Sequence, residues 1–181
     1  MIPFPNKKYP IIYADPPWEY KDSCRAGKRG ACYKYPTMSL MDIKALPVKD
    51  IAADNSVLFL WVTFPLLQEG LDLMPFWGFA YKTVGFVWTK GDLITGKFPM
   101  GMGSYTRSNP ELCLLGVRGK LKRVSAGVRS EIITPRWEHS KKPPEVRQRI
   151  VDLMGQNRSP RLELFARERL LGWDAWGNEC C

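Results

Sequence analysis

The sequence of 181 residues predicts an α/β fold, a three-layer α/β/α sandwich with a mostly parallel sheet. Short apolar runs of strand length alternate along the chain with segments whose apolar residues recur at helical spacing. One run, residues 57–62, is continuously apolar with β-branched and aromatic side chains, which is typical of a strand buried on both faces. The sequence shows no repeat, low-complexity tract or obvious linker, so residues 1–181 are expected to form a single domain.

The first strand and the first helix are predicted before residue 50. Residues 11–14 form a short apolar run that stops at Asp15. Ser39 can cap a helix, because its side-chain oxygen can accept a hydrogen bond in the first helical turn, and Pro47 ends that helix. The apolar positions that share one face of this helix are Leu40, Ile43 and Leu46.

The middle of the chain predicts one helix and two further strands. Pro65 begins a helix that is broken near Pro75 and Gly78. Its apolar positions are Leu67, Leu71 and Met74. Residues 81–88 and 112–117 are predicted strands, and a long loop rich in glycine and methionine joins them.

The helix with the clearest pattern begins at Pro143-Pro144 and ends at Gly155. Its apolar stripe consists of Val146, Ile150, Leu153 and Met154. Residues 161–165 follow as a strand. Because ligands of such sheets bind beyond the carboxyl ends of the strands, Asp15 and Arg167 become candidates for a site.

The formal net charge of +9 indicates an acidic partner such as nucleic acid, because a phosphate backbone binds dispersed positive charge. A solvated basic surface is the alternative interpretation of the same charge. The basic side chains expected to contact nucleic acid are Arg25, Lys28, Arg29, Lys34 and Arg107. A second basic cluster consists of Arg118, Lys120, Lys122, Arg123 and Arg129.

Cysteine and histidine usage argues against a metal site and against a disulfide framework. The five cysteines are scattered without a C-x-x-C pair, and His139 is the single histidine. The amino terminus lacks the apolar stretch of a signal peptide, and the longest apolar run is too short to span a bilayer. We therefore expect a cytoplasmic protein without a metal and without a membrane partner.

The predicted chemistry lies in the four residues directly after the first strand, Asp15-Pro16-Pro17-Trp18. Such a motif can act on the exocyclic amine of adenine. This amine is a poor nucleophile, because its lone pair is delocalised into the ring. Asp15 can accept one amine hydrogen and the carbonyl of Pro16 the other, which draws the lone pair out of the ring plane. The prolines restrict φ and so aim that carbonyl in advance, and Trp18 can stack on the base. A simple turn after a strand is the alternative interpretation.

Residues 13–18 resemble the catalytic motif of the MT-A70 family of N6-adenine methyltransferases. The similarity continues in the same order through Y-x-T-M-S, F-L-W-V-T, E-x-C-L-x-G and L-F-A-R segments. These segments are residues 35–39, 59–63, 111–116 and 164–167, with further matches at 139–145 and 172–179. The resemblance implies a Rossmann-like methyltransferase fold whose catalytic half precedes its cofactor half, with S-adenosylmethionine as the methyl donor and no metal.

The resemblance also implies roles for individual side chains. Asp15, Pro16, Pro17 and Trp18 would be catalytic, and the cofactor would be bound by Asp15, Lys142, Phe165, Arg167, Asn178 and Glu179. Lys142 is expected to pair with the cofactor carboxylate and Arg167 to reach its ribose. The acceptor pocket is assigned to Trp18, Tyr35 and Trp61. The glycine-containing loops at 21–34 and 91–109 are expected to frame the acceptor and to become ordered when it binds.

The acceptor and the assembly stay open at the level of sequence. The compact chain resembles phage and bacterial members that modify DNA, so DNA is favoured over RNA, and a bacterial or phage-infected cell is the expected setting. An RNA adenosine methyltransferase and a non-catalytic partner subunit that binds nucleic acid are the alternatives. The retained motif at residues 15–18 favours an active enzyme. A monomer and a dimer are both compatible with the sequence.

Overall fold

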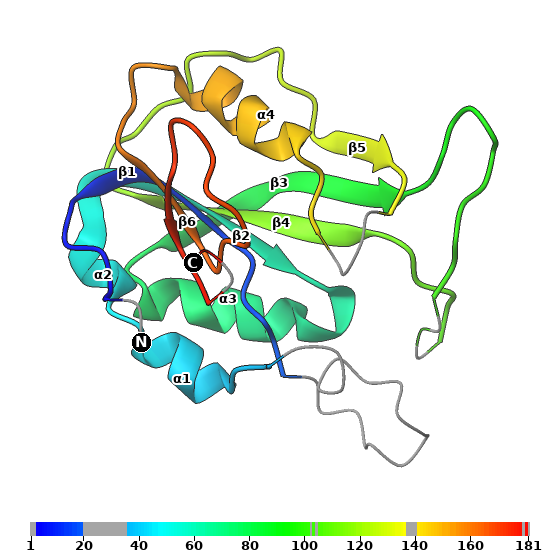
Figure 1. Ribbon diagram of the computed structural model, residues 1–181, viewed down its shortest axis with the longest axis horizontal. Coiled ribbons are helices and arrows are strands. Elements are labelled where there is room, and N and C mark those ends of the chain that lie inside the picture. Colours follow the sequence, from blue (N-terminus) through cyan, green and yellow to red (C-terminus); the bar gives the residue numbers. More distant parts are fainter. Residues whose placement is uncertain are drawn as a thin grey trace.

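A seven-stranded sheet in the order β5-β3-β4-β2-β1-β6-β7 forms the centre of the computed structural model (Figure 1). The structure describes residues 3–19, 36–101, 103, 105–136, 141–178 and 180. Its strands are β1 (Tyr9–Ala14), β2 (Ala52–Val62), β3 (Ala80–Lys90), β4 (Glu111–Arg118), β5 (Glu131–Thr134), β6 (Arg161–Leu164) and β7 (Asp174–Trp176). Its helices are α1 (Leu40–Ala45), α2 (Val48–Ile51), α3 (Leu67–Phe76) and α4 (Glu145–Met154).

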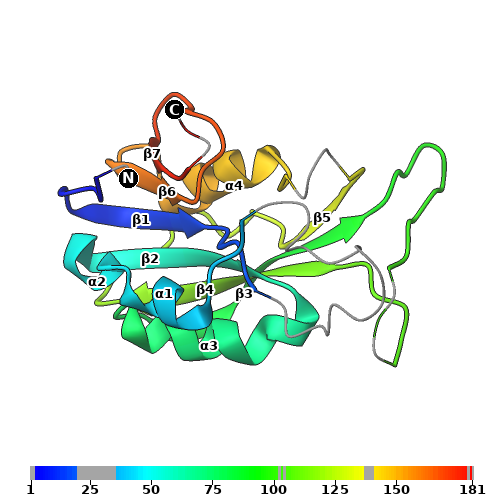
Figure 2. The ribbon, with the colours of Figure 1, turned by 60° about the horizontal axis from the view of Figure 1, so that its bottom comes forward.

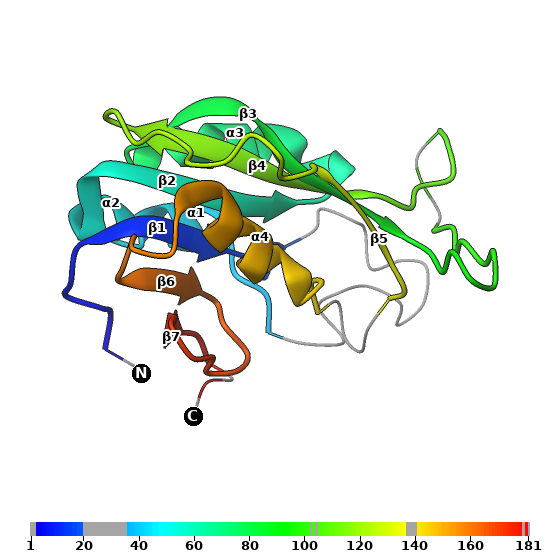
Figure 3. The same ribbon diagram turned by 90° about the horizontal axis from the view of Figure 1, so that it is seen from above.

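Helices cover both faces of the sheet. Figures 2 and 3 show α1, α2 and α3 on one face and α4 on the other. The side chains of β1 alternate between the two cores, as the pleat of a strand requires. Ile12 and Ala14 pack in the core beneath α1 and α3, whereas Ile11 and Tyr13 pack in the core beneath α4. The predicted three-layer α/β/α sandwich is therefore confirmed.

The sheet is mostly parallel, as predicted, but one central strand is reversed. Parallel pairing joins β1 to β2, β1 to β6, β3 to β5 and β6 to β7. Strand β4 runs antiparallel to both β2 and β3. Leu112 at the start of β4 pairs with Val62 at the end of β2. The amino end of β4 therefore lies at the end of the sheet where the carboxyl ends of β1 and β2 lie.

Several element boundaries differ from the sequence prediction. Strand β2 begins at Ala52 instead of residue 57, because residues ahead of the apolar run also pair with neighbouring strands, Ala52 with Tyr9 and Ser56 with Arg118. The short elements β5, β7 and α2 carry no sequence signal, since three or four residues are too few to show a period. Pro65 lies in a 3₁₀ turn that precedes α3, and α3 continues through Pro75 to Phe76.

Two helix boundaries follow the predicted chemistry. The Ser39 hydroxyl accepts a hydrogen bond from the Asp42 amide at 3.1 Å, so Ser39 caps α1 as predicted. Gly155 lies directly after α4, and its amide donates to the Val151 carbonyl at 2.7 Å. Among the described residues, no helix has the length and apolar character needed to cross a membrane.

Candidate active site

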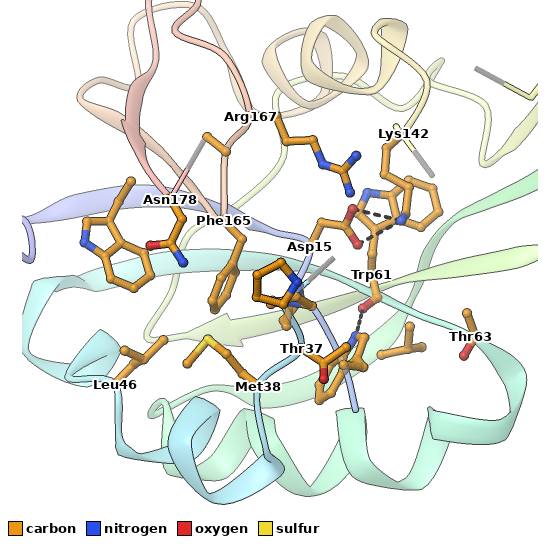
Figure 4. A pocket seen from close by; sticks show the side chains of 18 of the residues that line it. Asp15, Thr37, Met38, Leu46, Trp61, Thr63, Lys142, Phe165, Arg167 and Asn178 are labelled. Atoms are coloured by element: carbon orange, nitrogen blue, oxygen red, sulfur yellow. Dashed lines mark hydrogen bonds and ion pairs between the residues drawn. The ribbon is translucent and has the colours of Figure 1, made fainter. Parts of the chain in front are cut away.

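A pocket of about 640 Å³ opens beyond the carboxyl ends of β1, β2 and β6. Its volume lies in the range of small-molecule and cofactor sites. Nine of the residues predicted for the site line it: Asp15, Pro16, Pro17, Trp18, Trp61, Lys142, Phe165, Arg167 and Asn178. In Figure 4, Asp15, Lys142 and Arg167 gather at one end, and Met38, Leu46 and Asn178 lie toward the other. The pocket thus has one charged end and one largely apolar end.

The segment 15–18 is held in place by backbone hydrogen bonds. The Trp18 amide donates to the Pro16 carbonyl at 2.8 Å, and the Met38 amide donates to the Pro17 carbonyl at 2.8 Å. The Glu19 amide donates to the Met38 carbonyl at 3.2 Å, which completes a short bridge between the two segments. A carbonyl oxygen has two lone pairs, so the Pro16 carbonyl can still accept a second hydrogen bond.

Trp18 forms part of the pocket wall and is almost completely buried. Only 6% of its surface is exposed, and its indole N–H donates to the Trp61 carbonyl at 3.0 Å. The Trp61 indole N–H in turn donates to the Tyr13 hydroxyl at 2.7 Å. Both aromatic side chains are therefore fixed by directional bonds as well as by packing.

The charged end of the pocket is organised around the Lys142 ammonium. This group lies 2.8 Å from the Asp15 carboxylate and 3.2 Å from the Glu111 carboxylate. Glu111 also pairs with Lys90 at 2.6 Å. The Lys142 ammonium further lies 5.5 Å from the centre of the Trp61 ring, within reach of a cation–π contact.

The pKa values at this end follow from burial and from these ion pairs. Burial raises the pKa of Asp15, and the charges of Lys142 and Arg167 only partly oppose that shift. For Lys142, burial acts to lower the pKa, but the two carboxylates outweigh it and raise the pKa, so the ammonium stays charged. For Glu111, burial acts to raise the pKa, yet Lys142 and Lys90 hold it below its ordinary value.

The apolar end is shaped by the segment that follows β6. Contrary to the predicted strand at 161–165, β6 ends at Leu164, and Phe165 adopts a left-handed φ of 61°. This left-handed conformation interrupts the extended backbone of the strand, and the Ala166 amide donates to the Trp176 carbonyl at 3.0 Å. The Phe165 and Trp176 rings meet edge to face with centroids 5.6 Å apart.

Gly177 allows the close approach of this segment to β7. A Cβ atom built at Gly177 would collide with the backbone carbonyl oxygen of Ala166 and lie 2.8 Å from the carbonyl carbon of Phe165. Only glycine therefore fits between β7 and the turn after β6. Asn178, the next residue, is placed in the pocket as a result.

A family model described as MT-A70 matches residues 9–179. The chain belongs to the MT-A70 family. Family membership, predicted from the ordered motifs, is thus confirmed for nearly the whole chain. It also confirms that the sheet belongs to a Rossmann-like methyltransferase fold, for which S-adenosylmethionine is the implied cofactor.

Individual relatives differ in length. This MT-A70 chain is 37% identical over 193 residues to the type II methyltransferase M.MunI of a Mycoplasma species. The alignment covers 97% of this chain and 79% of that protein. It is 30% identical to the human N(6)-adenine-specific methyltransferase METTL4 and 26% identical to the human N(6)-adenosine-methyltransferase catalytic subunit METTL3. The chain spans only 38% and 28% of the length of these two human proteins.

Several pocket residues of this MT-A70 protein were not assigned from sequence. Glu111 begins an otherwise apolar strand, and a carboxylate at such a strand end is a usable signal. Trp176 and Gly177 lie inside the matched segment at 172–179, beside the predicted Asn178. Leu46 was assigned only to the apolar face of α1, and its place in the pocket depends on how α1 packs beside the motif.

Other predicted residues lie elsewhere or outside the described part of the chain. Tyr35, Glu179, Arg25, Lys28, Arg29 and Lys34 fall outside the described residues, as does the loop at 21–34. Arg107 is exposed on the long loop between β3 and β4 and does not line the pocket. The second basic cluster begins at Arg118, the last residue of β4. Because β4 runs antiparallel to β2, Arg118 lies at the end of the sheet opposite to the pocket.

Proposed function

We propose that the protein transfers a methyl group from S-adenosylmethionine to the N6 amine of adenine in a nucleic acid, and that DNA is the acceptor. One observation carries the proposal: Asp15 at the end of β1 shares a single pocket with Lys142, Phe165 and Arg167. The residues predicted to act on the acceptor and those predicted to hold the donor are therefore next to one another. Such proximity is what a direct transfer between two bound reactants requires.

The two ends of the pocket fit the two ends of S-adenosylmethionine. Its amino-acid part carries an ammonium and a carboxylate, which match the Asp15 carboxylate and the Lys142 ammonium. Its adenine ring matches the apolar end, where Phe165 and Leu46 offer apolar contacts and Asn178 offers an amide. The bound cofactor would supply an electrophilic methyl group on a sulfonium.

The residues of the protein would prepare the acceptor amine. The Asp15 carboxylate would accept a hydrogen bond from one N–H of the amine and the Pro16 carbonyl from the other, so that the nitrogen lone pair turns toward the methyl group. The bridge between Pro17 and Met38 holds the Pro16 carbonyl in place before the acceptor arrives. The buried Trp18 indole closes the wall beside this position and helps to exclude water.

The comparisons support DNA over RNA. Identity and coverage are both higher with the bacterial type II methyltransferase than with the human protein named for adenosine, the ribonucleoside. The human relative named as adenine-specific lies between them in identity. A target base in duplex DNA would have to be turned out of its stack to reach the pocket.

Transfer of tritium from methyl-labelled S-adenosylmethionine tests the proposal. The acceptors are bacterial genomic DNA that lacks N6-methyladenine, the same DNA after denaturation, and total RNA, and the labelled base is identified after digestion. We expect label in N6-methyladenine from DNA. Label confined to RNA would reverse the choice of acceptor, and label in neither, from a folded protein, would refute the activity. Calorimetry with S-adenosylmethionine separates the last case further, because a subunit without a donor site gives no heat of binding.

A further inference from the structure

Four charged side chains of alternating sign lie in a row across the sheet edge that holds the pocket. Lys90 ends β3, Glu111 begins β4, Asp15 follows β1, and Lys142 reaches them from the segment before α4. The Lys90 ammonium is 2.6 Å from one Glu111 oxygen. The Lys142 ammonium is 3.2 Å from the other Glu111 oxygen and 2.8 Å from Asp15. We call these four residues the charge row.

Lys90, the far end of the charge row, is not a solvated surface lysine. Its amide donates to the Asn109 side-chain oxygen at 2.7 Å, and the Asn109 amide group donates back to the Lys90 carbonyl at 2.7 Å. Its ammonium lies 5.4 Å from the Trp88 ring centre, much as the Lys142 ammonium lies 5.5 Å from that of Trp61. The two tryptophan rings pack edge to face at 6.4 Å. Both cations are therefore held against one rigid aromatic pair.

We propose that Lys90 and Glu111 are positioning residues of the transfer reaction. Glu111 is a second carboxylate, besides Asp15, that holds the Lys142 ammonium. Lys90 compensates the charge of Glu111. The positive charge of Lys142 then acts mainly on Asp15. Side-chain exposures of 22% for Lys90, 10% for Glu111 and 11% for Lys142 limit the screening of these pairs by water. The inference rests on the proposed function, in which ionised Asp15 accepts a hydrogen bond from the acceptor amine.

Most charged and titratable groups around Asp15 outside the charge row are neutral or are paired with an opposite charge. The charged and titratable groups that act on it are Lys142, Glu111, Arg167, Glu163, Tyr13 and Cys113. Burial raises the pKa of both Tyr13 and Cys113, which keeps them neutral. Arg147 pairs with Glu163 through two hydrogen bonds of 2.6 and 2.7 Å and so offsets its charge. Burial raises the pKa of Asp15 most, and among the charged groups Lys142, which lowers this pKa, and Glu111, which raises it, act most strongly.

Two neutral variants should shift the activity profile in opposite directions. In Glu111→Gln the repulsion is gone, so the acid limb of kcat/KM should move to lower pH by about one unit. In Lys90→Met the Glu111 charge is uncompensated, so the acid limb should move to higher pH. The double variant removes a neutral pair and should return the limb close to that of the parent. Lys90→Arg keeps the charge and should retain the parental limb.

Lys82→Met is the matched control, because Lys82 lies exposed on the same strand β3. Its profile should equal that of the parent. Shifts of the same sign in Lys90→Met and Glu111→Gln, or unchanged limbs in both, would overturn the inference, since a merely structural role lowers rates without opposite shifts. NMR titration of the Asp15 carboxyl carbon should show pKa shifts in the same directions in each variant, and this measurement does not require turnover. If the protein methylates nothing but the Asp15 pKa still shifts in opposite directions in Lys90→Met and Glu111→Gln, the electrostatic role of the charge row is supported and the proposed function is refuted.

Discussion

Asp15 and Phe165 lie side by side at the ends of two neighbouring parallel strands, because the residues before them, Ala14 in β1 and Leu164 in β6, are paired in register. The predicted catalytic motif and the predicted cofactor segment are far apart in the chain, yet this single pairing brings them to the same end of the sheet. Parallel strands that end together leave a crevice at that edge, which is where α/β sheets bind ligands. The pocket follows from the topology of the sheet.

Replacement of Asp15 by alanine should abolish methyl transfer and leave the fold intact. The variant removes the carboxylate that would accept an amine hydrogen, and loss of one such preorganised partner typically costs about 100-fold or more in rate. Most of the affinity for the cofactor should remain, because Phe165, Arg167 and Asn178 still line the pocket. Single-turnover transfer rates, with cofactor affinity from calorimetry, check the prediction. Turnover equal to that of the parent would remove Asp15 from the mechanism.

Replacement of Lys142 by methionine should make the activity depend on alkaline pH. Burial raises the pKa of Asp15, and the variant removes Lys142, the main group that opposes this shift. More of the carboxyl is then protonated near neutral pH, and the active ionised form is recovered only as the pH rises. The dissociation constant of the cofactor should also increase roughly 10-fold with the loss of a charged hydrogen bond. A pH–rate profile and calorimetry measure the two effects, and an unchanged profile would contradict the assigned role.

Local pattern was sufficient to predict the parts of the fold that depend on nearby residues. The apolar run at 57–62 and the cap at Ser39 indicated the central strand and the start of α1, because burial and capping are encoded within a few positions. The family motifs placed Asp15 and Phe165 in one site, and the structure brings both to the pocket.

Contacts that depend on strand direction could not be predicted in this way. Glu111 lies at the pocket because β4 runs antiparallel to β2, and no local pattern specifies that reversal. Trp176 reaches the pocket because a strand of only three residues adds to the edge of the sheet beside β6. The left-handed turn at Phe165 is followed directly by the Ala166–Trp176 hydrogen bond, a contact between two segments of the chain that no local pattern specifies.

Replacement of Gly177 by alanine should damage the apolar end of the pocket, where the cofactor adenine is proposed to bind. The added Cβ would collide with the Ala166 carbonyl oxygen, so the chain around Asn178 must shift. Forcing an extra carbon into such a contact destabilises a protein by about 1–3 kcal/mol. Gly127→Ala is the control, because the nearest atom to its Cβ, the Ser125 hydroxyl oxygen, is 3.8 Å away. Chemical denaturation and cofactor titration should show losses in Gly177→Ala alone, and equal behaviour of the two variants would refute the close approach.

Two tryptophan-to-phenylalanine variants should separate stability from catalysis. Trp18 and Trp77 are both buried, and each donates its indole N–H to a backbone carbonyl, that of Trp61 at 3.0 Å and that of Ile43 at 3.1 Å. Phenylalanine keeps an aromatic ring at either position but removes this hydrogen bond, which contributes about 0.5–1.5 kcal/mol to the free energy of unfolding. The two variants should therefore lose similar stability in urea.

Their activities should differ, because Trp18 belongs to the predicted catalytic motif and lines the pocket, whereas Trp77 packs at the end of α3 against α1. Without the bond to Trp61, the smaller phenyl ring of the Trp18→Phe variant is free to tilt, and the acceptor base meets a wall that is no longer fixed. We expect kcat/KM for the nucleic acid to fall in Trp18→Phe and to stay near the parental value in Trp77→Phe, measured at a temperature where both are folded. Equal activities at equal stability would show that Trp18 serves the fold alone.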